Sequence, residues 1–495
     1  MTEIHDAVVV GGGIIAAAAA QHLTAAGYRT LLAERGDYGS GTSSRTSRLQ
    51  HCGLSYFSPA GNSIAAFILN PRFGLSCMEL TRRAMRGRAE FVKSSPERVR
   101  PLTFVVPLTP DNAIPVWKAR LAFKMMEIFD AGRVPLDLRV LSASQARAYP
   151  GLQGLADLGR IRGAITFTEH QFIWPERIVI DTIMKARDQG LEALNYSPVT
   201  GVSRDGEGWR VTMQTPGGPC EVRTRAVVNC AGVWVDEITA MTGANTVKLN
   251  SGAKGTNIAV RLPERFRGIG FDTVTSTGMA FYLIPWGDLH YIGPWDTPAT
   301  GTRENFRASG DEIDAILNEM SLLFPEIGLT RKDVLYSWAG ARPRTAREGQ
   351  ILGSMEVMEH DLTHQGMPNF FVFTGGLLMT HRDAGRRLAA AVARRLKPSG
   401  APQPIDYSVR LVPDGDRVSE TSVMHVVQNE QARSLAGILR RRLPVGWEAD
   451  LGLPQAGEAA RIAAPLLGWS PAETATEIER FRKNTILNFN PAIPA

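Results

Sequence analysis

The chain has 495 residues, of which 44% are hydrophobic and 21% are charged, as in a globular protein with more than one domain. The formal net charge of +6 suits an anionic substrate or a membrane surface, and the scattered basic residues form no nucleic-acid motif. We therefore predict no nucleic-acid partner. The four cysteines, Cys52, Cys77, Cys220 and Cys230, show neither metal-ligand spacing nor a disulfide framework, so we expect no metal site and a cytoplasmic location.

The N-terminus begins with the acidic sequence MTEIHD, and residues 7–20 are therefore predicted to form a core strand and helix rather than a signal peptide. A membrane-spanning helix needs about 18 apolar residues, and no uncharged apolar run in this sequence is that long.

Residues 7–34 follow the pattern of strand, glycine turn, helix, strand and acid that is typical of a dinucleotide site. Gly11 allows the tight turn, and Gly13 lets the backbone approach a pyrophosphate. The helix that begins at Ile14 offers free N–H groups to the phosphates, and Glu34 suits the ribose hydroxyls. This pattern predicts a dinucleotide but does not distinguish NAD from FAD.

Two further strand ends carry small residues. The sequence AVVNCAGVWV at 226–235 reads as a strand that returns beside the first glycine turn. Another apolar strand ends in a glycine pair, and a helix from about residue 383 to 396 follows this pair. The N-terminus of that helix can stabilise negative charge on a flavin. Three such strand ends favour FAD. They add the cofactor-binding candidates Ala231, Gly232, Trp234, Gly375 and Gly376.

With these motifs the chain resembles the FAD-dependent glycerol-3-phosphate dehydrogenases and oxidases of the glycine/D-amino-acid oxidase superfamily. The resemblance extends along most of the chain, with order and spacing kept. It rests on VVVGGGI (8–14), TSSRTSRLQHCGLSYF (42–57), VVNCAGVWV (227–235), SWAGARP (337–343) and FTGGLLMTHR (373–382).

The resemblance implies an α/β fold with a Rossmann-like FAD-binding domain, an antiparallel-sheet substrate domain and a small C-terminal helical domain. We assign residues 1–60, 162–245 and 341–397 to the FAD-binding domain, 61–161 and 246–340 to the substrate-binding domain, and 405–495 to the helical, cap-like domain.

The same resemblance extends the list of cofactor residues by Thr42, Ser43, Ser44, Arg48, Leu49, Leu377 and Thr380. His51 is the first candidate for the acid/base, because imidazole titrates near neutrality, although it could instead bond the backbone or flavin. Arg342 would polarise the substrate oxygen or bind an anion, and a structural ion pair is the alternative. Tyr56 is expected on the substrate side. His381 and Arg382 are expected to face the same cavity, unless His381 caps a helix.

Several positions depart from the family pattern. They are Cys52 for glycine, Ser55 for arginine, Leu377 for lysine, His381 for tyrosine, and Pro294 with Trp295 in a stretch that reads TT in the family. Each charge-assisted contact to an anion is worth roughly 1.5–3 kcal/mol. Losing two cations should weaken phosphate binding by on the order of a hundredfold, unless another arginine compensates. Leu377 and Trp295 are also expected to make the pocket more apolar.

We therefore expect FAD-dependent oxidation of a secondary alcohol, such as a glycerol-3-phosphate-like polyol phosphate, with quinone or O2 as electron acceptor. The alternatives are an oxidase of an amine or hydroxy acid in specialised metabolism, and a flavin-binding protein without turnover. Residues 80–93 and 117–129 predict helices with apolar and basic faces, which suit either peripheral contact with the inner membrane face or plain solvation. The oligomeric state stays open, a homodimer included.

Overall fold

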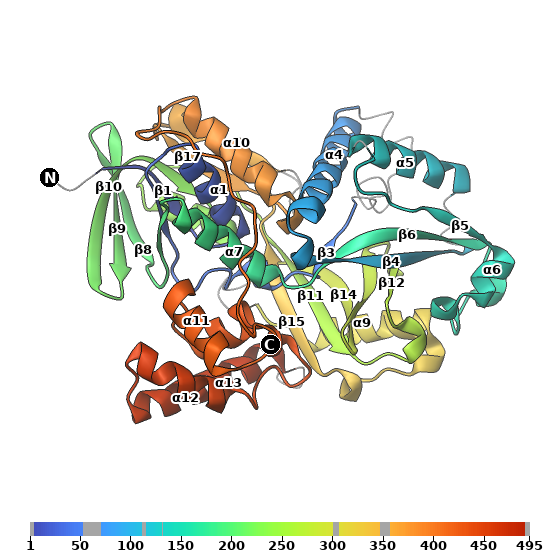
Figure 1. Ribbon diagram of the computed structural model, residues 1–495. Coiled ribbons are helices and arrows are strands. Elements are labelled where there is room, and N and C mark those ends of the chain that lie inside the picture. Colours follow the sequence, from blue (N-terminus) through green and yellow to red (C-terminus); the bar gives the residue numbers. More distant parts are fainter. Residues whose placement is uncertain are drawn as a thin grey trace.

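The computed structural model describes residues 4–52, 71–110, 115–130, 132–299, 306–346 and 357–490. Within these ranges the chain forms two sheets with flanking helices and a C-terminal group of helices (Figure 1). The predicted fold class is thereby confirmed.

The first sheet has the order β16-β17-β10-β1-β2-β7, in which β17, β10, β1, β2 and β7 are parallel and β16 is antiparallel to β17. β8 and β9 continue from β10 as an antiparallel meander. All six residues of β1 are buried, as expected for a parallel strand that is covered on both faces. Its strands are β1 (His5–Val10), β2 (Thr30–Ala33), β7 (Glu192–Leu194), β8 (Val199–Asp205), β9 (Gly208–Thr215), β10 (Gly218–Asn229), β16 (Met358–Asp361) and β17 (Phe370–Thr374).

Four helices accompany this sheet: α1 (Ile14–Ala25), α7 (Pro175–Asp188), α8 (Val235–Ala240) and α10 (His381–Ala393). Figure 1 shows α1 between α7 and α10, and it packs against both. The five alanines at 16–20 of α1 are fully buried, and a Cβ at Gly385 of α10 would lie 2.6 Å from the carbonyl oxygen of Ala18. Small residues therefore let these helices approach closely.

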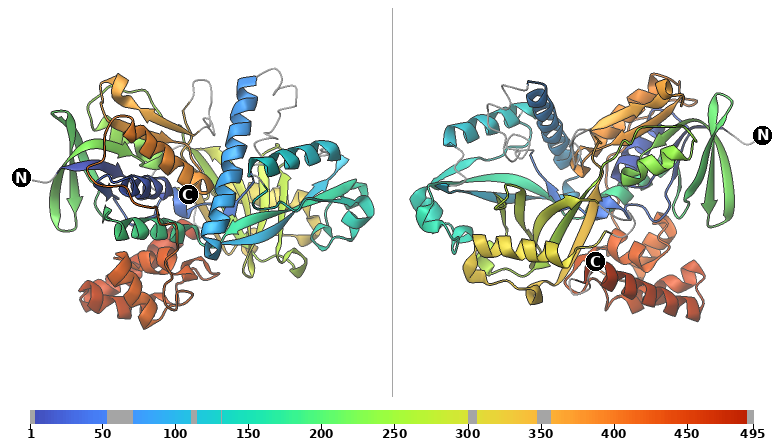
Figure 2. Two further views of the ribbon diagram at one scale, coloured as in Figure 1. Left: turned by 45° about the horizontal axis from the view of Figure 1, so that its top comes forward. Right: turned by 180° about the vertical axis from the view of Figure 1, so that it is seen from behind.

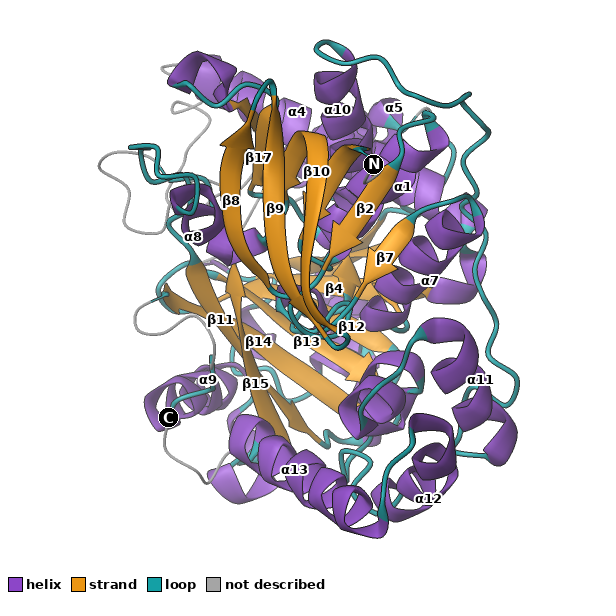
Figure 3. Ribbon diagram, turned by 90° about the vertical axis from the view of Figure 1, so that its left-hand side faces the viewer, coloured by secondary structure: helices purple, strands orange, loops and turns teal. Residues whose placement is uncertain are grey.

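The second sheet runs in the order β15-β11-β14-β13-β12-β4-β6-β3, with β5 paired to β6. Its pairings are antiparallel except for β12 with β4 among the described strands. Figure 3 shows it beneath the parallel sheet. Its strands are β3 (Leu49–Gln50), β4 (Val99–Leu108), β5 (Arg139–Ser142), β6 (Gly163–Phe172), β11 (Ala253–Val260), β12 (Ile269–Val274), β13 (Ala280–Trp286), β14 (Leu289–Pro298) and β15 (Tyr336–Arg342).

Four more helices flank the second sheet: α4 (Pro71–Ser94), α5 (Val116–Phe129), α6 (Ala143–Ala148) and α9 (Gly310–Leu323). Helices α4 and α5 contain the two segments in which the sequence predicts amphipathic helices. Helix α9 lies within 246–340, a range assigned from the sequence to the antiparallel-sheet substrate domain. The Ser309 hydroxyl and the Glu312 carboxylate form a reciprocal capping box that starts this helix.

Two strands differ from the domain assignment made from the sequence. β3 and β6 fall in the ranges assigned to the FAD-binding domain, yet both belong to the second sheet. β6 is buried along nearly its whole length, which hides the two-residue alternation of a sheet strand. Its ten pairings with β4 determine its place, and such long-range pairing is not visible in a local sequence pattern.

The C-terminal helices are α11 (Glu420–Glu430), α12 (Ala456–Leu467) and α13 (Pro471–Phe489), and they enclose an apolar core of their own. Both views of Figure 2 show them together at one end of the molecule. Two buried ion pairs join this group to the FAD-binding half. Arg442 donates to Asp37 at 2.6 Å, and Arg177 donates to Glu430 at 2.5 Å.

Candidate active site

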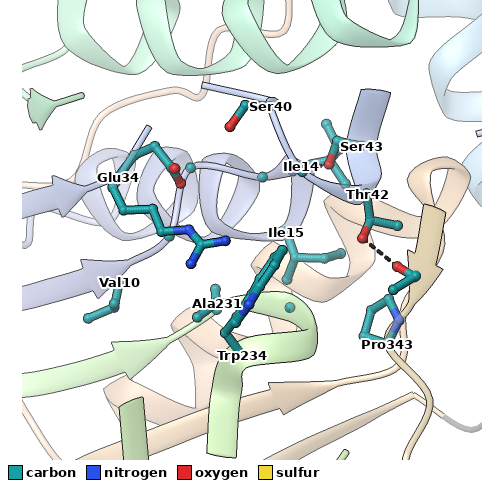
Figure 4. A pocket seen from close by; sticks show the side chains of 18 of the residues that line it. Val10, Ile14, Ile15, Glu34, Ser40, Thr42, Ser43, Ala231, Trp234 and Pro343 are labelled. Atoms are coloured by element: carbon teal, nitrogen blue, oxygen red, sulfur yellow. Dashed lines mark hydrogen bonds between the residues drawn. The ribbon is translucent and has the colours of Figure 1, made fainter. Parts of the chain in front are cut away.

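A cavity of about 510 Å³ opens where the ends of β1, β2, β10 and β17 meet the N-terminus of α1. Figure 4 shows its side chains arriving from separate segments, and the Thr42 hydroxyl donates to the carbonyl of Ala341 in β15. The predicted cofactor residues that line it are Gly11, Gly13, Ile14, Glu34, Thr42, Ser43, Ala231, Gly232, Trp234, Gly375 and Gly376. Segments from the whole FAD-binding half therefore converge on one space.

The glycine turn brings backbone to the centre of this cavity. Gly11 has a φ of +112°, and a Cβ there would lie 2.7 Å from the Cys230 carbonyl oxygen. The N–H of Ile14, the first residue of α1, donates to the Ser43 hydroxyl at 3.0 Å. A helix N-terminus within a glycine-lined wall suits a pyrophosphate.

Glu34 stands at the end of β2 and lines the cavity. Its Oε1 accepts a hydrogen bond from the Gly36 N–H at 2.7 Å, and burial raises the pKa of its carboxyl group. A buried carboxyl group needs hydrogen-bond partners, and the ribose hydroxyls of a dinucleotide are suitable ones.

Arg45 lines the cavity as well, although the sequence reading did not select it. Its Nη1 is buried without a hydrogen-bond partner among the described residues, and burial lowers the pKa of the guanidinium to about 10. A buried N–H of a guanidinium without an acceptor is costly unless a ligand oxygen accepts from it. The glycine turn, the buried acid and this arginine together fit FAD. The basic residue within TSSRTSR was the available sequence signal for it.

The C-terminal helices also reach this cavity. Asn488, near the end of α13, is among the lining residues, and the neighbouring Phe489 ring lies 4.5 Å from the Arg45 guanidinium. No local pattern in α13 indicates this role, because it arises from the packing of distant segments.

Arg48 lies away from the cavity lining, in contrast to the expectation. Its guanidinium donates to Glu176 at 3.2 Å, and both side chains are buried. It is held between the rings of Trp286 and Trp447, at 4.5 and 4.2 Å. Arg48 therefore joins the FAD-binding segment, the second sheet and the C-terminal helices behind the cavity wall.

Four other predicted cofactor residues are also absent from the lining of the described cavity: Ser44, Leu49, Leu377 and Thr380. The Ser44 hydroxyl donates to the Gly41 carbonyl at 3.0 Å, and the Thr380 hydroxyl to the Leu377 carbonyl at 3.2 Å. These contacts shape the turns whose neighbours do line the cavity, such as Ser43 and Leu378.

Arg342 ends β15, and the adjacent residues Ala341 and Pro343 line the cavity. Its guanidinium binds both carboxylate oxygens of Asp296, at 2.6 and 3.0 Å. Burial and the charge of Arg342 lower the pKa of His51 to about 4. The two main catalytic candidates are therefore close enough to interact, and the imidazole of His51 is neutral at pH 7.

His381 and Arg382 turn toward α4 and away from the cavity, in contrast to the expectation. His381 is buried, with its Nδ1 2.7 Å from the Leu378 carbonyl oxygen. Arg382 donates to the Ser94 hydroxyl at 2.6 Å and lies over the Tyr407 ring. Both residues begin α10, and packing between helices decides where they point. Tyr56 and Ser55 lie outside the described residues.

Two substitutions expected to make the substrate pocket more apolar pack elsewhere. Trp295 joins the apolar cluster between the second sheet and α9, on the opposite face from Trp338. Leu377 packs against the core around α1 and β17. Their apolar surface therefore belongs to the protein core.

Among the described residues, no helix combines the length and the apolar character needed to cross a membrane.

The family model "DAO: FAD dependent oxidoreductase" matches residues 6–394. A glycerol-3-phosphate dehydrogenase of Synechocystis sp. is 28% identical over 420 residues, covering 81% of this chain and 72% of the relative. A D-erythritol 1-phosphate dehydrogenase of Brucella abortus is 28% identical, covering 78% and 73%.

Among solved structures, the glycerol-3-phosphate dehydrogenase from Bacillus halodurans complexed with FAD has a TM-score of 0.73 at 20% identity. The match covers 100% of this chain and 97% of that one. The likeness includes the C-terminal helices, which lie beyond the residues that the family model matches.

Proposed function

Because this chain belongs to the DAO family of FAD-dependent oxidoreductases, we propose that it oxidises a secondary alcohol to a ketone. Bound FAD supplies the acceptor for the hydride from the carbinol carbon. The relatives named for glycerol 3-phosphate and D-erythritol 1-phosphate support an alcohol as the substrate class. An amine or a hydroxy acid is the alternative substrate.

The observation that carries this proposal is the position of Arg342 at the end of β15, between the cavity-lining residues Ala341 and Pro343, where its charge also acts on His51. Alcohol oxidation releases the hydroxyl proton, so a base must lie near the substrate oxygen. His51 is neutral at pH 7 and can accept that proton. In our proposal Arg342, held by Asp296, contacts the same oxygen and stabilises the negative charge that develops on it.

The test is anaerobic reduction of the purified, FAD-loaded protein by a panel of polyol phosphates, neutral polyols, hydroxy acids and amines. We expect bleaching of the flavin by at least one secondary alcohol. His51→Gln should slow this reduction by roughly a hundredfold or more while FAD stays bound. Cys52→Ala, which changes the neighbouring buried side chain, serves as the matched control and should have a much smaller effect.

If His51→Gln and Cys52→Ala slowed flavin reduction equally, the proposed role of His51 would be contradicted. Bleaching by amines or hydroxy acids alone would favour the alternative substrate class. A protein that binds FAD but is bleached by no compound in the panel would point to a flavin-binding protein without turnover.

We further propose a peripheral membrane contact through α5, which would bring the flavin near quinone. Its residues Trp117, Leu121 and Ile128 expose 62%, 56% and 65% of their surface. Lys118 and Lys124 accompany them on this helix. Exposed apolar side chains flanked by cations suit an anionic bilayer surface. Oxygen remains the alternative acceptor, and measuring flavin reoxidation by a soluble quinone and by O2 separates the two.

A further inference from the structure

A second cavity, of about 430 Å³, lies between α4, α10 and the end of α5. It shares no lining residue with the cofactor cavity. Figure 1 shows α4 between α10 and α5, and α4 contacts both helices. The charged side chains that line this second cavity are Arg86, Lys93, Arg133 and Arg386, together with Glu90 and Asp130. Cations therefore outnumber acids in its walls.

Both acids of this cavity already have partners. The two carboxylate oxygens of Glu90 accept hydrogen bonds from Arg386 of α10, each at 3.0 Å. Asp130 accepts the Gly132 N–H at 2.8 Å and lies 4.0 Å from the buried guanidinium of Arg88. These acids are therefore not available to neutralise the remaining cations.

The remaining cations, Arg86, Lys93 and Arg133, form no hydrogen bond or ion pair with the residues that the structure describes. Arg86 and Lys93 lie two turns apart on one side of α4, whereas Arg133 comes from the turn after α5. Three like charges around one cavity repel one another, and an anion bound between them offsets this repulsion.

The wall that α5 contributes to this cavity is apolar. Ile128 and Phe129 line the cavity, and Ile128 is 65% exposed. Trp117, Leu121 and Ile128 recur on one face of α5, at spacings of about one and two helical turns. The cationic cavity therefore opens at the end of an exposed apolar stripe.

We propose that this cavity binds the phosphate group of an anionic phospholipid, whose acyl chains lie along the exposed apolar stripe of α5. A phosphate offers several acceptor oxygens, so it can bind cations that arrive from two segments. The acyl chains cover apolar surface that an inorganic phosphate would leave exposed to water. This inference rests on the proposed membrane contact through α5 and adds a defined site for the lipid headgroup.

The first experiment measures sedimentation of the FAD-loaded protein with two kinds of phosphatidylcholine vesicle of equal surface charge. One contains phosphatidylglycerol, and the other contains cholesteryl hemisuccinate, whose anionic group is a carboxylate. We expect binding to the phosphatidylglycerol vesicles to be at least about fivefold tighter. The triple variant Arg86→Gln, Lys93→Gln, Arg133→Gln should lose this preference.

The matched control is the triple variant Lys332→Gln, Arg433→Gln, Arg461→Gln. It removes the same charge at exposed positions outside α4, α5 and α10. The control should keep the preference for phosphatidylglycerol. Equal binding of the wild type to the two kinds of vesicle, or a preference that persists when the cavity cations are removed, would overturn the inference.

The second experiment separates a lipid headgroup from a free phosphate. Calorimetry compares inorganic phosphate with dihexanoylphosphatidylglycerol below its critical micelle concentration, so that no bilayer is present. We expect the short-chain lipid to bind at least about tenfold more tightly, because its chains contact Ile128 and Phe129. Equally tight binding of inorganic phosphate, lost when the cavity cations are removed, would mean that the cavity binds a free phosphate and would overturn the lipid assignment.

The two experiments together separate this inference from the proposed membrane contact. If the cavity binds the short-chain lipid but the protein binds no vesicles, the phosphate site stands and the membrane contact fails. If the wild type and the cavity variant bind both kinds of vesicle alike, the membrane contact stands and the phosphate site fails.

Discussion

The guanidinium of Arg45 lies 4.5 Å from the centre of the Phe489 ring, so the motif after the glycine turn meets the last turn of the final helix. Arg440 lies over the same ring at 4.3 Å. The C-terminal helices thus complete the wall behind Arg45 and hold its side chain against the cofactor cavity.

Arg45→Ala should weaken FAD binding by about ten- to a hundredfold, since a charge-assisted contact is worth roughly 1.5–3 kcal/mol. Phe489→Leu should weaken it less, because the arginine remains but loses its stacking partner. Titration of the apoprotein with FAD, followed by flavin fluorescence, measures both. Unchanged affinity in Arg45→Ala would contradict the placement of a cofactor oxygen at its unpaired Nη1.

Gly11→Ala should abolish FAD binding, because the added Cβ would lie 2.7 Å from the Cys230 carbonyl oxygen. Gly190→Ala is its matched control, with a similar φ of +103° but open space around the Cβ. It should cost only the backbone strain of about 1 kcal/mol. FAD content after purification and thermal unfolding compare the two. Normal FAD content in Gly11→Ala would show that the glycine turn can move away from the Cys230 carbonyl oxygen and still bind FAD.

Glu169→Gln should stabilise the protein at neutral pH. Burial raises the pKa of this carboxyl group from 4.5 to about 7, so the folded state holds its proton more tightly than the unfolded state. The free energy of unfolding of the wild type therefore falls as the pH rises from about 4.5 to 7, by about 3 kcal/mol. The free energy of unfolding of the Glu169→Gln variant does not fall in this way, because glutamine does not titrate.

Urea unfolding of both proteins between pH 5 and 8 measures the effect of Glu169. The advantage of the variant should be small at pH 5 and largest above about pH 7. A difference in stability between the two proteins that does not change with pH would mean that Glu169 has the same pKa in the folded and unfolded states.

Replacing Trp117 and Ile128 of α5 by serine should lower binding to vesicles of anionic lipid by at least about tenfold, since each apolar side chain contributes roughly 1.5–3 kcal/mol when buried. Leu411→Ser is the control, because Leu411 is 70% exposed but belongs to the segment that precedes α11. Sedimentation with vesicles measures the bound fraction. Equal binding of all three proteins would refute the membrane contact through α5.

The nucleotide half of the site follows from local sequence patterns, because its chemistry depends on backbone geometry at contiguous residues. Gly11 and Gly13 lie in one turn, Ile14 begins the helix that follows it, and Glu34 directly follows the next strand. The spacing of such residues determines where they lie once the strands pair in parallel. The same reasoning fails for Arg48 and Arg382, because a long side chain can reach several partners.

The sequence by itself determined the type of fold, the FAD-binding turns and the candidate pair His51 and Arg342, since each depends on short motifs and on burial along single elements. Only the tertiary structure decided that Arg48 is bound by Glu176 and that Arg45 faces the cavity. It alone brought Arg86 and Lys93 of α4 and Arg133 of the turn after α5 around one cavity. The physical reason is that charge partners in a buried site come from strand pairing and domain packing, which a one-dimensional pattern does not contain.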